Sequence, residues 1–177
     1  MGTIRVVWGA ATGPTAMASY DAALAEANVH DYNLVRVSSV IPAGATLDVA
    51  GEAPDFGPAG ERLTVVQSRD TVALEENRPA VAGIGWARSA DQGPGIFYEA
   101  AGEDEVAVRE GIDAGLDHGA GLRDWTVAER GIEVRASPAS SASDASNHSG
   151  ASRPSEATDS FRTQVVCAIY GDAEPIL

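Results

Sequence analysis

Apolar side chains recur mostly in short β-branched runs, and only two segments repeat them at helical spacing. That spacing predicts helices over about residues 14–28 and 102–116. The order strand, helix, strands, helix, strands indicates an α+β fold in a single domain over residues 1–177. The predicted strands lie at residues 4–8, 32–40, 63–67, 80–90, 95–100, 125–135 and 164–170.

Residues 136–161 differ from the rest of the chain. They are mostly Ser, Ala, Asp, Asn and Pro, with almost no large apolar side chain. Such a segment cannot bury enough apolar surface to offset the entropy lost on ordering it. We therefore predict a disordered, Ser-rich insertion between two strands of the core. Residues 45–61, rich in Gly, Pro, Ala and acidic residues, are predicted to form a loop.

The charged residues exclude several classes of protein. The chain carries 12 basic and 26 acidic residues, a formal charge of −14, and every basic residue is an arginine. Without lysine, neither a lysine-linked pyridoxal phosphate nor a P-loop can form. The acidity disfavours nucleic acid as a partner, because phosphate contacts need a basic face. An acidic, lysine-free composition indicates a protein adapted to concentrated salt, where self-repulsion is screened.

Cysteine, histidine and hydropathy patterns give further expectations. Cys167 is the only cysteine, and His30, His118 and His148 lie far apart, so we expect neither a disulfide nor a metal site. The beginning of the chain lacks the pattern of a signal peptide, and no apolar run is long enough to span a bilayer. We therefore expect a cytoplasmic protein without a membrane partner.

Two adjacent serines, Ser38 and Ser39, lie near the end of the strand predicted at residues 32–40 and precede the turn marked by Pro42. Serines at strand ends commonly cap or turn the chain. Their spacing alone therefore does not distinguish a turn from a reactive site.

The whole string from Asn33 to Pro42, Asn-Leu-Val-Arg-Val-Ser-Ser-Val-Ile-Pro, resembles the self-processing site of the pyruvoyl-dependent arginine decarboxylases. In that family an aspartate on the first helix and an asparagine precede the cleaved serines, and an acid follows a later hairpin strand. Asp21, Asn33 and Glu99 stand at these places. The resemblance covers about residues 3–135 and resumes near Thr163.

The resemblance implies a four-layer α/β/β/α sandwich of mainly antiparallel sheets and a homotrimer with active sites between subunits. It also implies that the Ser39 hydroxyl attacks the Ser38 carbonyl, so that the chain cuts itself into residues 1–38 and 39–177. Residue 39 would become a covalent pyruvoyl group. Such a group would replace pyridoxal phosphate as the electron sink, which suits a chain that lacks lysine.

The implied reaction is decarboxylation of L-arginine to agmatine and CO2, through a Schiff base between the substrate amine and the pyruvoyl group. Glu99 is expected to protonate the resulting carbon, and Asn33 to polarise the Ser38 carbonyl or position the ketone. Asp21, four residues after Met17, is expected to be half-buried and to bind the guanidinium group of arginine.

Other interpretations stay open from the sequence. The chain could be a pyruvoyl decarboxylase of another amino acid, such as histidine or aspartate, although Asp21 favours a cationic substrate. It could also be an unprocessed, non-enzymatic homologue that serves as a partner subunit or scaffold. The use of agmatine, in polyamine synthesis or elsewhere, is likewise open.

Overall fold

The computed structural model describes residues 2–139 and 159–177. These ranges contain two α-helices, α1 (Ala16–Glu26) and α2 (Glu105–Gly121), a short 3-10 helix, η1 (Leu74–Glu76), and nine strands. The predicted α+β class is therefore confirmed. The strands are β1 (Thr3–Gly13), β2 (Asn33–Arg36), β3 (Val40–Ile41), β4 (Thr46–Gly51), β5 (Arg62–Ala73), β6 (Ala80–Ser89), β7 (Gly95–Gly102), β8 (Val127–Ser137) and β9 (Phe161–Glu174).

The strands form two sheets. The five-stranded sheet has the order β2-β5-β9-β1-β4, with β9 antiparallel to both β5 and β1 and with parallel pairs at the two edges. The four-stranded sheet has the order β3-β7-β6-β8 and is antiparallel throughout. The last strand, β9, therefore returns to the middle of the larger sheet.

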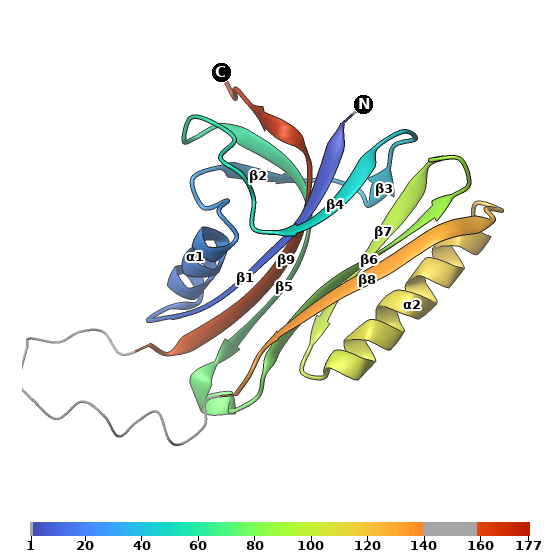
Figure 1. Cartoon of the computed structure of the whole chain (residues 1–177). Helices are drawn as coiled ribbons and strands as arrows, with labels where there is room; N and C mark the ends of the chain where they lie inside the picture. Colours follow the sequence, from blue (N-terminus) through green and yellow to red (C-terminus); the bar gives the residue numbers. More distant parts are fainter. Residues whose placement is uncertain (1, 140–158) are drawn as a thin grey trace, which may run out of the picture.

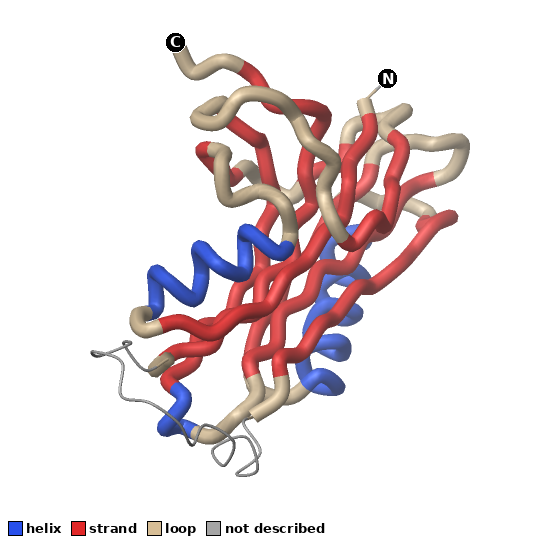
Figure 2. Tube along the Cα trace, turned by 60° about the vertical axis from the view of Figure 1, so that its left-hand side comes forward, coloured by secondary structure: helices blue, strands red, loops and turns tan. Residues whose placement is uncertain are grey.

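Apolar side chains form three clusters, each between neighbouring elements. The first joins α1 to the five-stranded sheet, the second fills the space between the two sheets, and the third joins the four-stranded sheet to α2. Figures 1 and 2 show the two helices on opposite sides of the strands. Representative members are Val7, Leu24 and Val65 in the first cluster, Val6, Ile84 and Phe97 in the second, and Val81, Ile112 and Leu116 in the third.

The chain crosses from one sheet to the other at residues 37–39. The Val37 N–H still donates to Val65 on β5, whereas Val40 already pairs with Ile96 on β7. The single strand predicted at residues 32–40 is therefore wrong: it is two short strands, one in each sheet. A valine-rich stretch does not reveal that its hydrogen-bonding partners change midway.

Other boundaries also differ from the prediction, and several strands are longer than predicted. The loop predicted at 45–61 contains β4, a mostly exposed edge strand that pairs parallel with β1. Residues 46–49 alternate polar and apolar side chains, but the run is short, and the Gly, Pro and acidic residues that follow it favour a loop. The insertion predicted at 136–161 overlaps the end of β8 and the start of β9, and its residues 140–158 lie outside the described residues.

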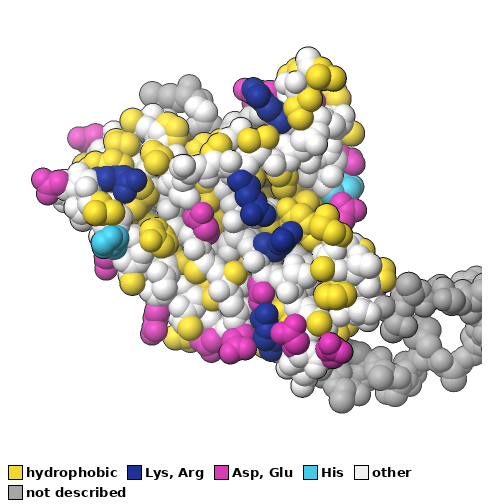
Figure 3. Space-filling view, turned by 180° about the vertical axis from the view of Figure 1, so that it is seen from behind, with side chains coloured by type: hydrophobic (Ala, Val, Ile, Leu, Met, Phe, Trp, Pro, Cys, Tyr) yellow, Lys and Arg dark blue, Asp and Glu magenta, His cyan; other side chains and the backbone are white. Residues whose placement is uncertain are grey.

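The surface mixes charges of both signs. On the face shown in Figure 3, carboxylates gather along the lower edge, while arginine side chains lie nearer the middle beside apolar side chains. No helix among the described residues is long and apolar enough to cross a membrane. Within the same residues, no group of three or more His, Cys, Asp or Glu side chains is placed to hold a metal ion.

Candidate active site

The sheet crossover opens onto a cavity of about 390 Å³. Three parts of the chain line it: the crossover itself, strand β7 and the C-terminal end of α2. The lining residues are Ser38, Ser39, Val40, Ile96, Phe97, Tyr98, Glu99, His118, Gly119, Leu122 and Arg123. Ser38, Ser39 and Glu99 thus meet in one place, although Ser39 and Glu99 are 60 residues apart in sequence.

Ser39 and Glu99 make direct contact. The Ser39 hydroxyl lies 2.9 Å from Oε2 and 3.0 Å from Oε1 of Glu99, and it donates to that carboxylate. A carboxylate that accepts a hydroxyl proton makes the oxygen a stronger nucleophile. The geometry therefore places a carboxylate that accepts the hydroxyl proton next to Ser39.

The backbone around Ser39 forms a three-residue turn. The Val40 N–H donates to the carbonyl oxygen of Ser38 at 2.8 Å, so the turn is closed by an i to i+2 hydrogen bond and centred on Ser39. The Phe97 N–H donates to the carbonyl oxygen of Ser39, also at 2.8 Å. The Val40 N–H thus already polarises the Ser38 carbonyl, which is the group that the Ser39 hydroxyl would attack.

Two glycines of α2 place strand β7. A Cβ at Gly115 would lie 2.2 Å from Cδ1 of Tyr98, and one at Gly119 would lie 2.5 Å from Cδ1 of Ile96. Only a residue without a side chain lets those two groups seat on the helix. Because side chains alternate along a strand, seating Ile96 and Tyr98 on α2 directs Glu99 to the other face, toward Ser39.

Tyr170, on β9, completes the surroundings of the turn. Its hydroxyl donates to the carbonyl oxygen of Val40 at 2.9 Å, and its ring packs edge-on against Phe97 with centroids 6.1 Å apart. Burial, and to a lesser extent the charge of Glu99, raises the pKa of Tyr170 above its ordinary value. The tyrosine is therefore a protonated donor at neutral pH.

Asn33 and Asp21 do not belong to the group of residues around Ser39 within this chain. The Asn33 amide donates to Gly60 at 2.6 Å, at the start of β2, and neither residue lines the cavity at Ser39. The half-buried position predicted for Asp21 is wrong, because the face of α1 that packs on the sheet carries Ser19, Ala23 and Leu24. Met17 is 68% exposed, so the residue four positions later also faces solvent.

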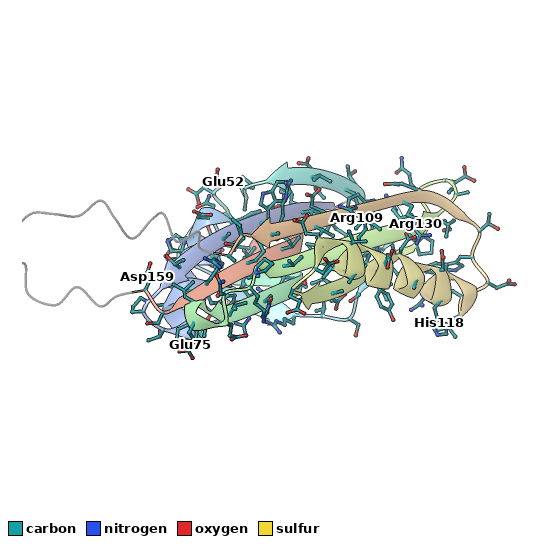
Figure 4. The ribbon with its side chains drawn as sticks, turned by 90° about the horizontal axis from the view of Figure 1, so that it is seen from below. Glu52, Glu75, Arg109, His118, Arg130 and Asp159 are labelled. Carbon is teal, nitrogen blue, oxygen red and sulfur yellow. The ribbon has the colours of Figure 1, made fainter. Side chains whose placement is uncertain are left out.

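Three lining or contacting residues were missed by sequence reasoning: His118, Arg123 and Tyr170. His118 lies on α2, at the opposite end of the molecule from Glu75 and Asp159 (Figure 4). Arg123 donates to the Gly119 carbonyl at 3.0 Å and stacks on Trp125. No spacing links these residues to the serines, so only the fold could bring them together.

Comparison with known proteins gives one consistent family. The family model described as pyruvoyl-dependent arginine decarboxylase matches residues 3–175. A protein of Halobacterium salinarum named pyruvoyl-dependent arginine decarboxylase is 46% identical over 181 aligned residues, covering 99% of this chain and 98% of the relative. Proteins of the same name from Pyrococcus horikoshii and Methanopyrus kandleri are 32% and 33% identical, covering 73% and 76% of this chain and 84% and 82% of their own.

Proposed function

The chain belongs to the pyruvoyl-dependent arginine decarboxylase family, and we propose that it matures by cutting itself between Ser38 and Ser39. Membership makes it a decarboxylase, a lyase whose prosthetic group is a covalently bound pyruvoyl group. One observation supports the cut at this bond: the Ser39 hydroxyl donates to Glu99 while the Ser38 carbonyl accepts from the Val40 N–H. An activated hydroxyl beside a polarised carbonyl is what an acyl shift requires.

In the first step, Glu99 takes the Ser39 hydroxyl proton as that oxygen bonds to the Ser38 carbonyl carbon. The bond from this carbon to the Ser39 nitrogen then breaks, and the nitrogen takes up a proton, so an ester replaces the peptide bond. The Val40 N–H, at 2.8 Å, stabilises the charge that develops on the Ser38 oxygen. This assigns to a backbone donor the role that the sequence suggested for Asn33.

In the second step, loss of the Cα proton of residue 39 expels the Ser38 carboxylate from Cβ. Dehydroalanine remains at position 39. Water then replaces its nitrogen, which leaves as ammonia, so residue 39 becomes a pyruvoyl group. The sequence consumes water, releases ammonia and needs no oxidant or reductant. Its products are chains 1–38 and 39–177.

The residues around position 39 fit a pyruvoyl group. The carbonyl oxygen of residue 39 already accepts from Phe97, and the cavity of about 390 Å³ has room for a small substrate beside it. A pyruvoyl group there supplies a ketone that condenses with the substrate amine and accepts the electron pair left as CO2 departs. The Glu99 carboxylate, which lies 2.9 Å from the side-chain oxygen of Ser39, would return a proton to the carbon that loses CO2.

The substrate we propose is L-arginine, converted to agmatine and CO2, as the names of the relatives suggest. A guanidinium group calls for a carboxylate partner. Asp21 is exposed on α1, away from the chain's own Ser39, so it would meet the substrate of another subunit.

We further propose the homotrimer and the four-layer α/β/β/α arrangement that the family resemblance implies. Two observations support them. The three apolar clusters follow the order helix, sheet, sheet, helix. Val35, Val37 and Val40, at and before the crossover, are 43%, 39% and 44% exposed, as expected of residues that a neighbouring subunit covers. The chain's charge of −14 and the Halobacterium relative support adaptation to concentrated salt.

The test is the intact mass of the purified protein under denaturing conditions, after incubation in dilute and in concentrated salt. We expect two fragments that divide between Ser38 and Ser39, the larger one reactive toward hydroxylamine, and release of agmatine from arginine. A chain that stays whole at every salt concentration would favour a non-enzymatic partner subunit. A cut chain that consumes histidine or aspartate in place of arginine would favour another pyruvoyl decarboxylase.

Asp21 gives a second test. Asp21→Asn removes the charge that we propose binds the guanidinium group but leaves the serines untouched. We expect self-cleavage at the wild-type rate and a KM for arginine raised about 10-fold or more. Asp31→Asn, an exposed carboxylate in the loop after α1, is the matched control. An unchanged KM in Asp21→Asn would remove this residue from substrate binding.

A further inference from the structure

Tyr170 links the two sheets at Val40, the residue that follows Ser39. It belongs to β9 of the five-stranded sheet, whereas its acceptor, the carbonyl oxygen of Val40, belongs to β3 of the four-stranded sheet. The hydrogen bond is 2.9 Å long and crosses the space filled by the second apolar cluster. Tyr170 therefore anchors the crossover from the side opposite β7.

The segment that it anchors has little other support. Strand β3 is two residues long and, among the strands of the described residues, pairs with β7 alone, through Val40 with Ile96 and Ile41 with Gly95. The peptide plane between residues 39 and 40 carries both the oxygen that accepts from Phe97 and the N–H that donates to Ser38. The next plane, between residues 40 and 41, carries the oxygen that Tyr170 binds.

These two planes share the Cα atom of Val40. Holding the second plane fixes the position of that Cα atom and so limits the movement left to the first plane, whose N–H polarises the Ser38 carbonyl. After cleavage, residue 39 would be a chain end, and the same two planes would be what holds it. A loose chain end loses the alignment that the reaction needs.

We propose that Tyr170 is a positioning residue: its hydroxyl fixes the Val40 peptide, and thereby holds the Ser38 carbonyl in the turn before cleavage and the new chain end in place afterwards. This inference rests on the proposed self-cleavage. The raised pKa of Tyr170 keeps the hydroxyl protonated, and thus a donor, well above neutral pH. Among the described residues, Glu99 is the charged group that acts on this phenol, and its negative charge also raises the pKa of Tyr170.

The experiment compares Tyr170→Phe with Tyr32→Phe. Both variants keep the ring and lose one hydroxyl: in Tyr170 the donor to Val40, in Tyr32 the donor to Gly57, and neither Tyr32 nor Gly57 lines the cavity at Ser39. Freshly synthesised chain is followed by intact mass over time. We expect the half-time of cleavage to lengthen about 3- to 10-fold in Tyr170→Phe, the value of one lost hydrogen bond, and to stay unchanged in Tyr32→Phe.

Three readouts separate positioning from general destabilisation. Thermal unfolding midpoints should fall by similar amounts in the two variants, although only one slows cleavage. In chains that have matured, Tyr170→Phe should lower kcat for arginine and leave KM within about twofold, because the substrate-binding groups remain. In an uncleavable Ser39→Ala background, Tyr170→Phe should also speed amide hydrogen exchange in residues 38–42, a measurement that does not depend on activity.

The outcomes distinguish this inference from the proposed function. A wild-type chain that never cuts would overturn both. A wild-type chain that cuts, together with a Tyr170→Phe chain that cuts equally fast with equal kcat, would overturn the role of Tyr170 alone. If Tyr170→Phe folds poorly, unaltered exchange in residues 38–42 relative to the rest of the Ser39→Ala chain would overturn it as well.

Discussion

Each of two cavities in this molecule contains a glutamate whose carboxylate accepts a hydrogen bond, and the two bonds are almost equal in length. At the crossover, Glu99 accepts from the Ser39 hydroxyl at 2.9 Å. In a larger cavity of about 680 Å³, lined by Trp8 and Arg135 among others, Glu26 accepts from the Ala10 N–H at 3.0 Å. The first donor is a nucleophile beside a polarised carbonyl, and the second is a backbone amide that cannot attack anything.

Several polar groups of the larger cavity already have partners within the fold. Arg135 lies over the Trp8 ring at 3.8 Å and pairs with Glu133 at 2.8 Å, and the Gln164 amide donates to the Gly9 carbonyl. At the crossover, by contrast, the hydrogen bonds converge on the two residues of one peptide bond. The size of a cavity is thus a poorer guide to chemistry than the atoms on which its hydrogen bonds converge.

The largest effect that this contrast predicts belongs to Ser39→Ala. Without the hydroxyl, Glu99 has no nucleophile to activate, and we expect cleavage to disappear altogether. Ser38→Ala is the matched control, because Ser38 contributes only its carbonyl to the proposed step, and it should still cut. Intact mass after long incubation in concentrated salt is the measurement. A Ser39→Ala chain that cuts at the same bond would remove the hydroxyl from the mechanism.

The next largest effect is the difference in cleavage rate between variants of Glu99 and Glu26. Glu99→Gln keeps a hydrogen-bond acceptor for Ser39 but cannot take its proton, so cleavage should slow about 100-fold or more. Glu26→Gln keeps an acceptor for Ala10 and should cut at the wild-type rate. Time courses of fragment formation compare the two. Equal slowing in both variants would mean that loss of negative charge, and not loss of a base, controls the rate.

Most of the fold could be predicted from local patterns, and the exceptions share a cause. The apolar spacing of α1 and α2 and the β-branched runs were sufficient for the α+β class. The break at residues 37–39 and the edge strand β4 were not found, because both depend on which distant strand supplies the hydrogen bonds. A strand's partner is a property of the whole fold, not of its own residues.

The candidate site divides in the same way. The string around Ser38 and Ser39 and the acid Glu99 could be identified from their resemblance to a family, and the fold brings them into contact. Tyr170 could not be identified in this way. The alternation of Val166, Ala168 and Tyr170 predicts that its ring faces the core, but which carbonyl its hydroxyl meets depends on the register of two different sheets.

Cys167, which lines neither cavity, should affect the stability of the fold but not the rate of self-cleavage. Burial raises the pKa of Cys167 from 9.0 to about 11. Because the folded pKa is raised, the folded state favours the neutral thiol. Its contribution is complete below about pH 9 and is lost as the pH rises through about 11, at a cost of about 2–3 kcal/mol in the free energy of unfolding.

Denaturant unfolding of wild type and Cys167→Ala at several pH values from 7 to 11 is the measurement for this prediction. The difference between the two proteins should be constant up to about pH 9 and shift in favour of the variant above it. Tyr170 titrates in both proteins, so its effect cancels in the difference. Parallel curves at all pH values would show that the thiol is not held neutral by burial.

The smallest effect belongs to the larger cavity, at Arg135→Lys. The planar guanidinium stacks on Trp8 at 3.8 Å, and an ammonium group keeps the charge but not the flat contact. We expect the free energy of unfolding to fall by about 0.5–1 kcal/mol, because the site is partly exposed. Cleavage should proceed at the wild-type rate, as in Glu26→Gln. If Arg135→Lys slowed cleavage several-fold while unfolding barely changed, the larger cavity would be coupled to the crossover, and the contrast between a structural and a reactive cavity would fail.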